Sequence, residues 1–379
     1  MISYKYKLYV TKNTKHIDNM LCEACFVWNH ALALQKEFYK RYGKYIAVAR
    51  MQKHFAKRIK RRYLHSQSVQ EVLQRLDNAY KRFFKHSSKR PPKFKRTKDF
   101  CSFCFKQGGF ALDGNVFRIN SIKKNYKFSL SRQCLGNIKQ IRVKRSQLNE
   151  YYICVITDAT AKSYAKTHKG ASLGVDFGLK TYMTFSDGGK LSHPQFLKRD
   201  LKALRRASKN HSRCVKGSNH RERARLALCR EYERISNRRS DYQWKLAHKL
   251  CRKYDTIFVE DLNLSGMSKL WGRKMADLGH AQFCSILGQV ATKYGCTVHK
   301  IDKWFPSSKL CECGYKNNSL TLHERSWVCP HCGQHHDRDI HAAQMIYRRG
   351  IYELASGSKA KDPLGFSGNR VCNQESHSH

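Results

Sequence analysis

Residues 328–346 of the chain, VCPHCGQHHDRDIHAAQMI, gather side chains that can bind metal ions. The stretch contains two cysteines, four histidines and two aspartates. Cysteine thiolates and histidine nitrogens suit zinc, whereas carboxylates suit Mg²⁺. The stretch is therefore compatible with one metal site, with two sites of different chemistry, or with a polar helix start that binds no metal.

The cysteines favour zinc. Cys329-x-x-Cys332 is followed by glycine, as in a zinc knuckle, and Cys311-x-Cys313 is a second pair followed by glycine. Together they predict a four-cysteine zinc ribbon, although the first pair is one residue shorter than the usual spacing. His331 or a neighbouring histidine would replace a cysteine if the shorter pair cannot close. The alternative is a loop with free thiols.

A first carboxylate lies in the alternating segment LGVDFG, residues 173–178. Asp176 points to the same strand face as Gly174 and Gly178. We interpret these glycines as leaving space for a metal ion and a phosphate backbone. The alternative is an aspartate at a turn-rich strand end.

A second apolar strand, TIFVEDLNL, ends in Glu260 and Asp261. Two acids at the end of a buried strand are costly unless they bind something. Adjacent strand residues face opposite ways, so one of the two is expected to meet Asp176. The alternative role for Asp261 is to cap the helix that follows, which leaves Glu260 as the functional acid.

The third acidic group is HDRD, where Asp337 and Asp339 stand at the start of a predicted helix. Acids at this position commonly act only as caps. Phosphodiester hydrolysis with two Mg²⁺ needs carboxylates that converge from separate elements. An acid on a first strand, one on a later strand and one at a late helix start match an RNase H-type nuclease core.

The charge of the chain points to a polyanionic partner. The 379 residues contain 74 Lys and Arg against 28 Asp and Glu, a formal net charge of +46. Because the basic residues are spread over most of the chain, nucleic acid is the first candidate partner and an anionic membrane the second. We expect neither a signal peptide nor a membrane span, since no run of ~18 apolar residues occurs. The 16 cysteines then indicate reduced thiols and a metal site in an intracellular protein.

The first half of the chain has a strand–helix–strand order. An alternating strand starts at residue 2, and helical patterns follow over 18–42 and around 69–83. Pro91 and Pro92 end the helical part, and short strands occupy 100–158. This order predicts a small β-barrel interrupted by helices.

The second half opens at residue 171 with three strands before any helix, as in an RNase H-type core. Basic helices are predicted over 196–252, with a break at 216–219. These helices are followed by a buried strand, a helix over 277–294, another strand, the cysteine-rich segment and a last helix from Asp339. Beyond Gly350 the periodicity ends, which predicts a mobile tail.

Several segments resemble the TnpB proteins of bacterial insertion sequences, which look like the ancestors of type V CRISPR effectors. The strongest are GVDFGLKTYMTFSDG, FVEDLNLSGM, WFPSSKLCECG, SWVCPHCG and HDRDIHAAQMI, in the order and rough spacing of that family. CFVWNHALAL, LDNAYKRFFK, PPKFKRTKDFCSF and ISNRRSDYQWKLAHKL are weaker landmarks. The resemblance covers about residues 1–350 and is most specific over 304–346.

This resemblance implies an RNA-guided DNA endonuclease with a RuvC-type site. It carries the three metal-binding catalytic acids onto Asp176, Glu260 and Asp339, with two Mg²⁺ as cofactors, and leaves Asp337 as the helix cap. A structural Zn²⁺ would be held by the four cysteines. Two departures are the short first cysteine pair and RDIHAA, where His341 stands in the place of the family's asparagine. We interpret His341 as a variant on the helix face.

The implied fold is α+β and multidomain. A β-barrel wedge domain with a helical recognition insertion precedes an RNase H-like (RuvC) α/β nuclease domain that contains the zinc ribbon. The expected domains are the wedge over 1–12 and 93–165, the recognition part over 13–92, the nuclease domain over 166–305 and 335–352, the zinc ribbon over 306–334 and a disordered tail over 353–379.

The implied partners are a guide RNA from the transposon end and double-stranded target DNA, in the prokaryotic cytoplasm at the nucleoid. Guide pairing reads sequence, while the protein reads backbone shape and a short adjacent motif. Two glutamines, Gln70 and Gln74, are candidates for contacts with base edges, although a role as solvated surface residues is the favoured alternative for them. The candidates for phosphate contacts are the basic residues Arg90, Lys93, Lys95, Arg96, Arg238 and Arg239. For the two residues in the basic helices, the alternative is a solvated charged face.

Other functions stay compatible with these residues. The chain could be a miniature type V CRISPR effector, a guided or zinc-ribbon DNA-binding protein without cleavage, or a transposase that joins DNA ends. The presence of all three acids argues against a guided binder that has lost cleavage. An RNase H-type core is compatible with joining as well as with hydrolysis.

Overall fold

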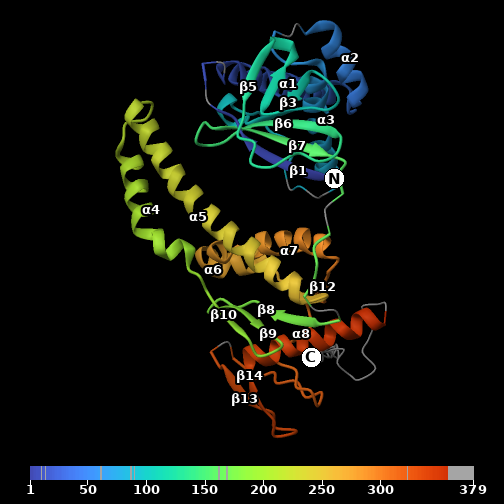
Figure 1. Ribbon diagram of the computed structural model, residues 1–379, viewed down its shortest axis with the longest axis vertical. Helices are drawn as coiled ribbons and strands as arrows, with labels where there is room; N and C mark the ends of the chain where they lie inside the picture. The colour runs from blue at the N-terminus through green and yellow to red at the C-terminus, as the bar shows by residue number, and fades with distance from the viewer. Residues whose placement is uncertain are drawn as a thin grey trace, which may run out of the picture. The chain divides into compact units, whose positions relative to one another are not determined.

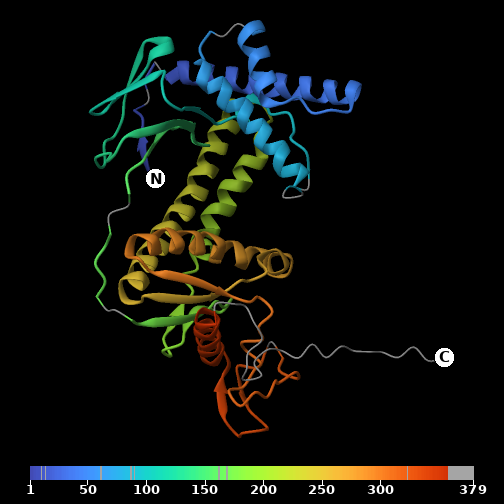
Figure 2. The ribbon, with the colours of Figure 1, turned by 90° about the vertical axis from the view of Figure 1, so that its right-hand side faces the viewer.

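The computed structural model describes residues 1–9, 11–12, 14–59, 62–85, 88, 90–160, 163–167, 170–321 and 323–356, without the side chains of Ser265, Ser268 and Arg273. The chain forms two compact units, Met1–Ala161 and Lys162–His379 (Figures 1 and 2). Each unit has its own hydrophobic core.

The first unit contains two antiparallel sheets. The four-stranded sheet has the order β1-β7-β6-β2, formed by Ile2–Lys7, Tyr151–Thr157, Ile138–Arg145 and Ser102–Phe105. The three-stranded sheet has the order β3-β4-β5, formed by Phe110–Asp113, Val116–Ile119 and Lys124–Lys127. A bridge between Leu8 and Phe128 joins the two sheets. The predicted strand–helix–strand order is present, and closure into a barrel stays a prediction.

Three helices lie between β1 and β2 in the sequence: α1 (Thr14–Tyr42), α2 (Val48–Arg58) and α3 (Ser66–Phe84). Their apolar faces share one core with the strands. Helix α2 was not predicted from the sequence pattern, because only two of its 11 residues, Met51 and Phe55, are buried. Such a short apolar face gives little periodic signal.

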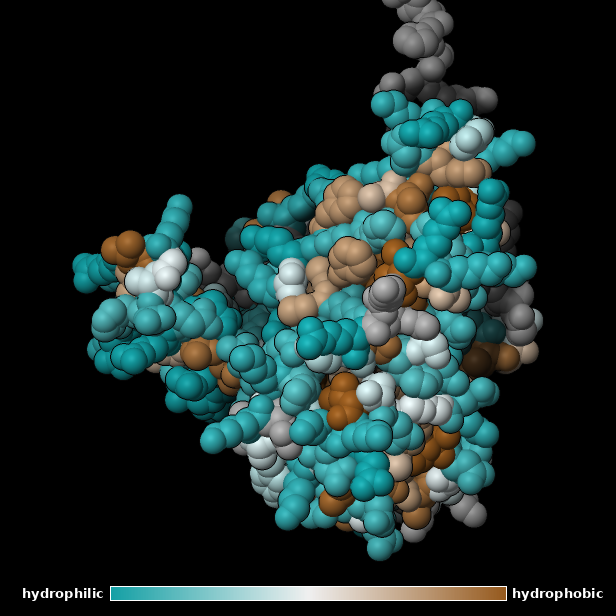
Figure 3. All heavy atoms as spheres, turned by 90° about the horizontal axis from the view of Figure 1, so that it is seen from above, coloured by the Kyte–Doolittle hydropathy of each residue, from teal (hydrophilic) through white to brown (hydrophobic). Residues whose placement is uncertain are grey.

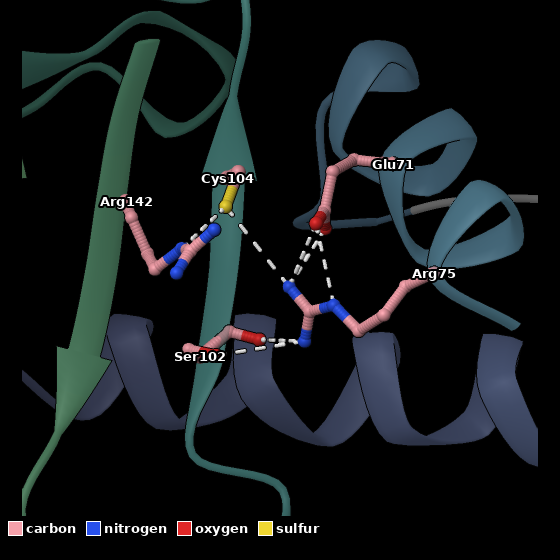
Figure 4. Close-up of polar contacts among 5 residues, drawn as sticks. All are labelled: Glu71, Arg75, Ser102, Cys104 and Arg142. Carbon is pink, nitrogen blue, oxygen red and sulfur yellow. Dashed lines mark hydrogen bonds and ion pairs between the residues drawn. The ribbon is translucent and has the colours of Figure 1, made fainter. Parts of the chain in front are cut away.

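A polar network fastens α3 to β2 (Figure 4). The Arg75 guanidinium donates to both carboxylate oxygens of Glu71, one turn earlier, and to the carbonyl of Ser102 at 3.1 Å. Next to it, Arg142 of β6 donates from Nε to the buried thiol of Cys104 at 3.2 Å. Burial raises the pKa of the Cys104 thiol, so this thiol acts as a structural acceptor and not as a reactive thiolate.

The second unit is built on a five-stranded mixed sheet with the order β10-β9-β8-β11-β12. The pairs β10–β9 and β9–β8 are antiparallel, and β8–β11 and β11–β12 are parallel. The strands are Lys190–Ser192, Thr181–Phe185, Ser172–Asp176, Thr256–Glu260 and Thr297–Ile301. The predicted three-strand opening of this unit is thus confirmed.

Helices cover both faces of this sheet (Figure 2). On one face, α5 (Asn219–Lys253) and α7 (His280–Tyr294) pack against Leu173, Val175 and their neighbours. On the other face, α8 (Arg338–Ala355) packs against Phe258 and Ile301 through Ile346. Alternate residues of a strand therefore serve two different cores.

The remaining elements of this unit are a helical hairpin, a short helix and a ribbon. α4 (Phe196–Arg213) pairs with α5, and Ser218 caps α5 by accepting a hydrogen bond from the Arg221 amide at 3.1 Å, which confirms the predicted break. α6 is Leu264–Leu278, and β13 (Ser326–Val328) pairs with β14 (His335–Asp337). The tail was predicted from residue 353, but α8 continues to Ala355, and residues 357–379 lie outside the described part.

The face drawn in Figure 3 is mainly hydrophilic. In the view of Figure 3, hydrophilic residues cover most of the face and hydrophobic residues lie among them in small patches. Among the described helices, none combines the length and the apolar character that crossing a membrane requires.

Two glycines let α8 lie close to the sheet. A Cβ atom at Gly174 would lie 2.3 Å from the carbonyl oxygen of Ala343, and a Cβ at Gly350 would lie 1.9 Å from the ring of Phe258. At Gly178 a Cβ would lie 2.6 Å from the carbonyl oxygen of Thr181. The interpretation that Gly174 and Gly178 leave space for a ligand is therefore wrong, because the protein itself occupies that space.

Gly350→Ala is expected to destabilise the protein by about 1–3 kcal/mol, the usual cost of overpacking a filled core. Gly288→Ala is the matched control, because Gly288 lies inside α7 with open space around its Cβ position. The control should gain up to about 1 kcal/mol from helix propensity. Thermal or urea unfolding of both variants measures the difference. Equal effects of the two substitutions would contradict the close approach at Gly350.

Candidate functional site

The structure brings the three predicted carboxylates together. Val175 of β8 pairs with Val259 of β11 in a parallel register. The next residues, Asp176 and Glu260, therefore end neighbouring strands at the same edge of the sheet. Asp339, in the first turn of α8, lines the same open cavity, whose volume is about 1120 Å³.

The electrostatics of the cavity favour the binding of a cation. Burial, together with the nearby charges of Glu260 and Asp339, raises the pKa of Asp176 to about 8, against a lowering by a hydrogen bond from the Phe177 amide. Burial also raises the pKa of Glu260, and a hydrogen bond from the Ser307 hydroxyl opposes this shift. Carboxylates that repel one another in a buried site are stabilised by a divalent cation. The oxygen-only donor set fits Mg²⁺.

The structure distinguishes Glu260 from its neighbour. Asp261 points away and pairs with Lys300 of β12 at 2.9 Å. The alternative of Asp261 as helix cap is wrong, because Asn263 caps α6 and accepts a hydrogen bond from the Gly266 amide at 3.1 Å. Strand alternation predicted that one of the two acids would meet Asp176, and that acid is Glu260.

Asp337 and Asp339 also have separate positions. Asp337 is the N-cap of α8, as predicted, and accepts hydrogen bonds from the amides of Asp339 and Ile340 at 3.1 Å each. It also pairs with Lys190 at 2.7 Å. The Asp339 carboxylate lines the cavity, where Arg325 approaches it at 3.4 Å.

Positive residues surround the acids. The basic side chains that line the cavity are Lys180, Lys198, Lys274, Arg325 and Arg338. The guanidinium of Arg338 donates to the carbonyl of Thr321 at 2.6 Å, so it also fastens the loop before β13. Neither these basic residues nor Ser307 were predicted from the sequence. Lysines and arginines are too common in this chain to be distinguished by type, and the RD pair of HDRD was the available signal for Arg338.

Asp176→Asn is expected to stabilise the protein by several kcal/mol at pH 8 when no Mg²⁺ is added, and by clearly less at pH 5. The folded pKa of about 8 exceeds the usual 3.8, so the carboxyl favours folding most below its unfolded pKa. That contribution is lost as the pH rises through about 8. Thermal unfolding at the two pH values, with Asp261→Asn as control, measures the effect. A pH-independent difference would refute the buried, repelled state of Asp176.

The four cysteines form a second site. Their sulfur atoms all lie within 4.8 Å of one another. Cys311 and Cys332 are 3.6 Å apart at sulfur, as are Cys313 and Cys329. Tetrahedral zinc with Zn–S bonds of about 2.3 Å places sulfurs roughly 3.8 Å apart, so the cluster fits zinc. The short pair therefore closes without a substituting histidine.

Two buried histidines connect this cluster to α8. His336 places Nε2 3.2 Å from the Cys311 sulfur, and His341 places Nε2 2.7 Å from the carbonyl oxygen of Leu310. His341 is only 2% exposed. It lies on the buried face of α8, so its interpretation as a variant on the helix face holds, and the contact adds that it joins α8 to the residue before Cys311. The predicted alternative ligand, His331, is exposed.

The predicted nucleic-acid contacts of the first unit have mixed surroundings. Gln70 and Arg90 are exposed, whereas the Gln74 amide donates to Asp77 at 3.1 Å. Lys93 is exposed but its carbonyl accepts from Trp28. The Lys95 ammonium lies 4.1 Å from the centre of the Trp28 ring, and burial lowers its pKa, so its surroundings favour a structural role over a phosphate contact. Arg96 pairs with Asp99 at 2.7 Å and is exposed.

In the second unit, Arg238 and Arg239 of α5 differ. Arg238 pairs with Asp200 at 2.9 Å and is partly exposed. Arg239 donates to the carbonyl of Ala276 at 2.6 Å and to Gln282, so it connects α5 to α6 and α7. Arg238 therefore stays a candidate for contacting phosphates, whereas the described contacts of Arg239 indicate a structural role.

Comparisons with known proteins give three family matches. Residues 152–270 match a family described as "Probable transposase", residues 280–346 match "Cas12f1-like, TNB domain", and residues 1–44 match "Helix-turn-helix domain". Over 1–44, the described residues form β1 and α1, one strand and one long helix.

Two curated relatives are similar over most of their length. A Streptomyces pristinaespiralis protein named "Putative RNA-guided DNA endonuclease" is 31% identical over 76% of this chain and 72% of its own. An Escherichia coli K12 protein with the same description is 28% identical over 88% of each chain. A solved Cas12f1–sgRNA–target DNA complex has a similar fold, with a TM-score of 0.58, 16% identity, and coverage of 89% of this chain and 83% of that one.

Proposed function

Because the chain belongs to the TnpB family of insertion-sequence-encoded RNA-guided DNA endonucleases, we propose that it binds a structured guide RNA and cleaves the target DNA that the guide pairs with. The observation that carries the proposal is the convergence of Asp176, Glu260 and Asp339 in one open cavity. These acids come from two neighbouring strands and a later helix, as a RuvC-type site requires.

The chemistry of cleavage is divided among the residues of the cavity. Two Mg²⁺ ions held by the three acids would supply an activated water and charge neutralisation at the leaving oxygen. The acids orient their oxygens from fixed strand and helix ends, so little reorganisation is needed on binding. Arg325 and the other basic residues on the cavity wall would hold the phosphates of the DNA strand against the acids.

The domain assignment follows the two units. The five-stranded sheet with α4–α8 is proposed as the RNase H-like nuclease domain over 166–305 and 335–352, with a zinc ribbon over 306–334. The first unit is proposed as the wedge over 1–12 and 93–165, with the helical recognition part over 13–92. The structure-guided boundary between units at Ala161 lies four residues before the predicted one.

The net charge of +46 supports the proposed partners. A guide RNA and a DNA duplex each carry one negative charge per nucleotide, and neutralising them releases counterions. Of the predicted contacts, those with exposed side chains are the best candidates for binding nucleic acid: Gln70 for base edges, and Arg90, Lys93, Arg96 and Arg238 for phosphates.

The test is to express the full chain together with the DNA locus that encodes it, purify the protein, and sequence the RNA that copurifies. We expect one discrete RNA species, and Mg²⁺-dependent cleavage of a duplex that matches its variable end. A duplex with a scrambled target is the control. Absence of a discrete RNA would favour a transposase or a plain DNA-binding protein. A discrete RNA without cleavage would favour a guided DNA-binding protein. The genes next to the locus distinguish a miniature CRISPR effector from a transposon-borne protein.

A further inference from the structure

Ser307 lies on the segment that leads from β12 to the cysteine cluster and contacts the cavity. Its hydroxyl donates a hydrogen bond to Oε1 of Glu260. Ser307 is only 7% exposed and lines the same cavity as the three acids. Among the described residues, it is the one side chain recorded in a hydrogen bond with the Glu260 carboxylate.

The backbone around Ser307 holds its hydroxyl in place. The Ser307 amide donates to the carbonyl of Phe305 at 2.9 Å, and the Leu310 amide donates to the carbonyl of Pro306 at 3.1 Å. Phe305 packs against the apolar cluster between the sheet and α8. The segment is thus a compact turn with an apolar anchor at its start.

The other end of the turn is fastened to the cysteine cluster. Leu310, whose carbonyl accepts the hydrogen bond from His341 of α8, directly precedes Cys311. The Cys311 amide donates to the carbonyl of Tyr315 at 2.8 Å, which closes the knuckle. The position of Ser307 is therefore determined by an apolar core on one side and by the cluster on the other.

We propose that Ser307 is a positioning residue that presents Glu260 to the catalytic metal, and that the cysteine cluster acts on the nuclease site through it. A serine hydroxyl has one proton to donate. Donating it to one carboxylate oxygen fixes the side-chain rotamer and leaves the other oxygen for a cation. Outer hydrogen-bond partners of metal-binding carboxylates typically contribute about 10–100-fold in metal affinity. This inference rests on the proposed role of Glu260 as a metal ligand.

The neighbouring residue provides a matched control. Ser308 lines the same cavity, but no hydrogen bond to Glu260 is recorded for it in the described residues. Ser307→Ala removes the donor, Ser307→Thr keeps it, and Ser308→Ala removes a hydroxyl of the same size from the same turn. The three variants separate the hydrogen bond from packing and from general polarity of the cavity.

The direct measurement is Tb³⁺ luminescence on the full chain with its RNA, excited through tryptophan. Trp271 lines the cavity and serves as sensitiser. The signal that remains in Glu260→Gln is subtracted as background from other sites. Ser307→Ala is expected to raise the half-saturating Tb³⁺ concentration about 10–100-fold. Ser308→Ala and Ser307→Thr are expected to stay within about threefold of the unmodified protein, since both keep the donor to Glu260.

Cleavage provides the second measurement. Ser307→Ala should raise the Mg²⁺ concentration for half-maximal cleavage by a similar factor, while the rate at saturating Mg²⁺ changes much less. An unchanged half-saturation for both ions would overturn the proposal. A lower rate at all Mg²⁺ concentrations with unchanged Tb³⁺ binding would also overturn it, since it indicates a purely structural role. If the unmodified protein binds Tb³⁺ at this site but cleaves no guided target, the proposed function fails while the role of Ser307 stands.

Discussion

Asp176→Ala is expected to reduce guided DNA cleavage by at least about 10³-fold and to leave RNA binding unchanged. Metal ions at such sites supply several kcal/mol of transition-state stabilisation, and each ~1.4 kcal/mol is tenfold in rate. Removing one carboxylate from the end of β8 disrupts the metal site without changing the positive charge that binds RNA. Single-turnover cleavage and copurified RNA content measure the two properties.

The neighbouring acids at the end of β11 and at the start of α8 provide internal controls for this prediction. Glu260→Gln should lose cleavage, whereas Asp261→Asn should keep it within a few fold, because Asp261 pairs with Lys300 outside the cavity. Likewise, Asp339→Asn should lose cleavage, while Asp337→Ala should mainly weaken the start of α8 by about 1 kcal/mol. Wild-type cleavage by Asp176→Ala, or equal losses within either pair, would refute the assignment of the acids.

Cys329→Ser is expected to remove bound zinc, unfold the ribbon and abolish most cleavage. The ribbon has a very small core, made of Cys311, Leu320, Trp327 and Cys329. Such a core cannot offset chain entropy by itself, and structural zinc contributes about 10–16 kcal/mol in zinc-finger peptides. We expect one zinc per chain by elemental analysis of the unmodified protein and a large loss in the variant. Limited proteolysis should then cleave near residues 311–335.

The control for the cluster is Cys214→Ser. Cys214 lies at the end of α4 and bonds the carbonyl of Asn210, so this variant should keep its zinc and its protease resistance. Since the turn that carries Ser307 ends at Cys311, partial loss of zinc should also raise the Mg²⁺ requirement for cleavage. A zinc-free protein with full cleavage and an intact ribbon would show that the thiols are not a structural metal site.

Local patterns predicted the elements that carry long, regular signals. The alternation in β1, the break between α4 and α5, the three-strand opening of the second unit and the N-cap at Asp337 are all confirmed. These features depend on neighbours in the sequence, where period and capping chemistry act directly. By contrast, α2, with two buried residues, and α6 were not predicted, because short or irregular apolar faces give weak periodicity.

For the site, the sequence by itself determined which chemistry the chain can do: carboxylates at two strand ends and a helix start, and paired cysteines followed by glycine. The family resemblance already selected Glu260 and Asp339 within the two pairs, and the tertiary structure supplied the physical reason, since these acids line the cavity. Only the tertiary structure decided that Gly174 accommodates α8 and not a ligand, and that Ser307 and His341 connect the cysteine cluster to the acids. These outcomes depend on contacts between residues 31 to more than 160 positions apart. No local pattern encodes such contacts, because they arise only when the sheet, α8 and the turn before Cys311 pack against one another.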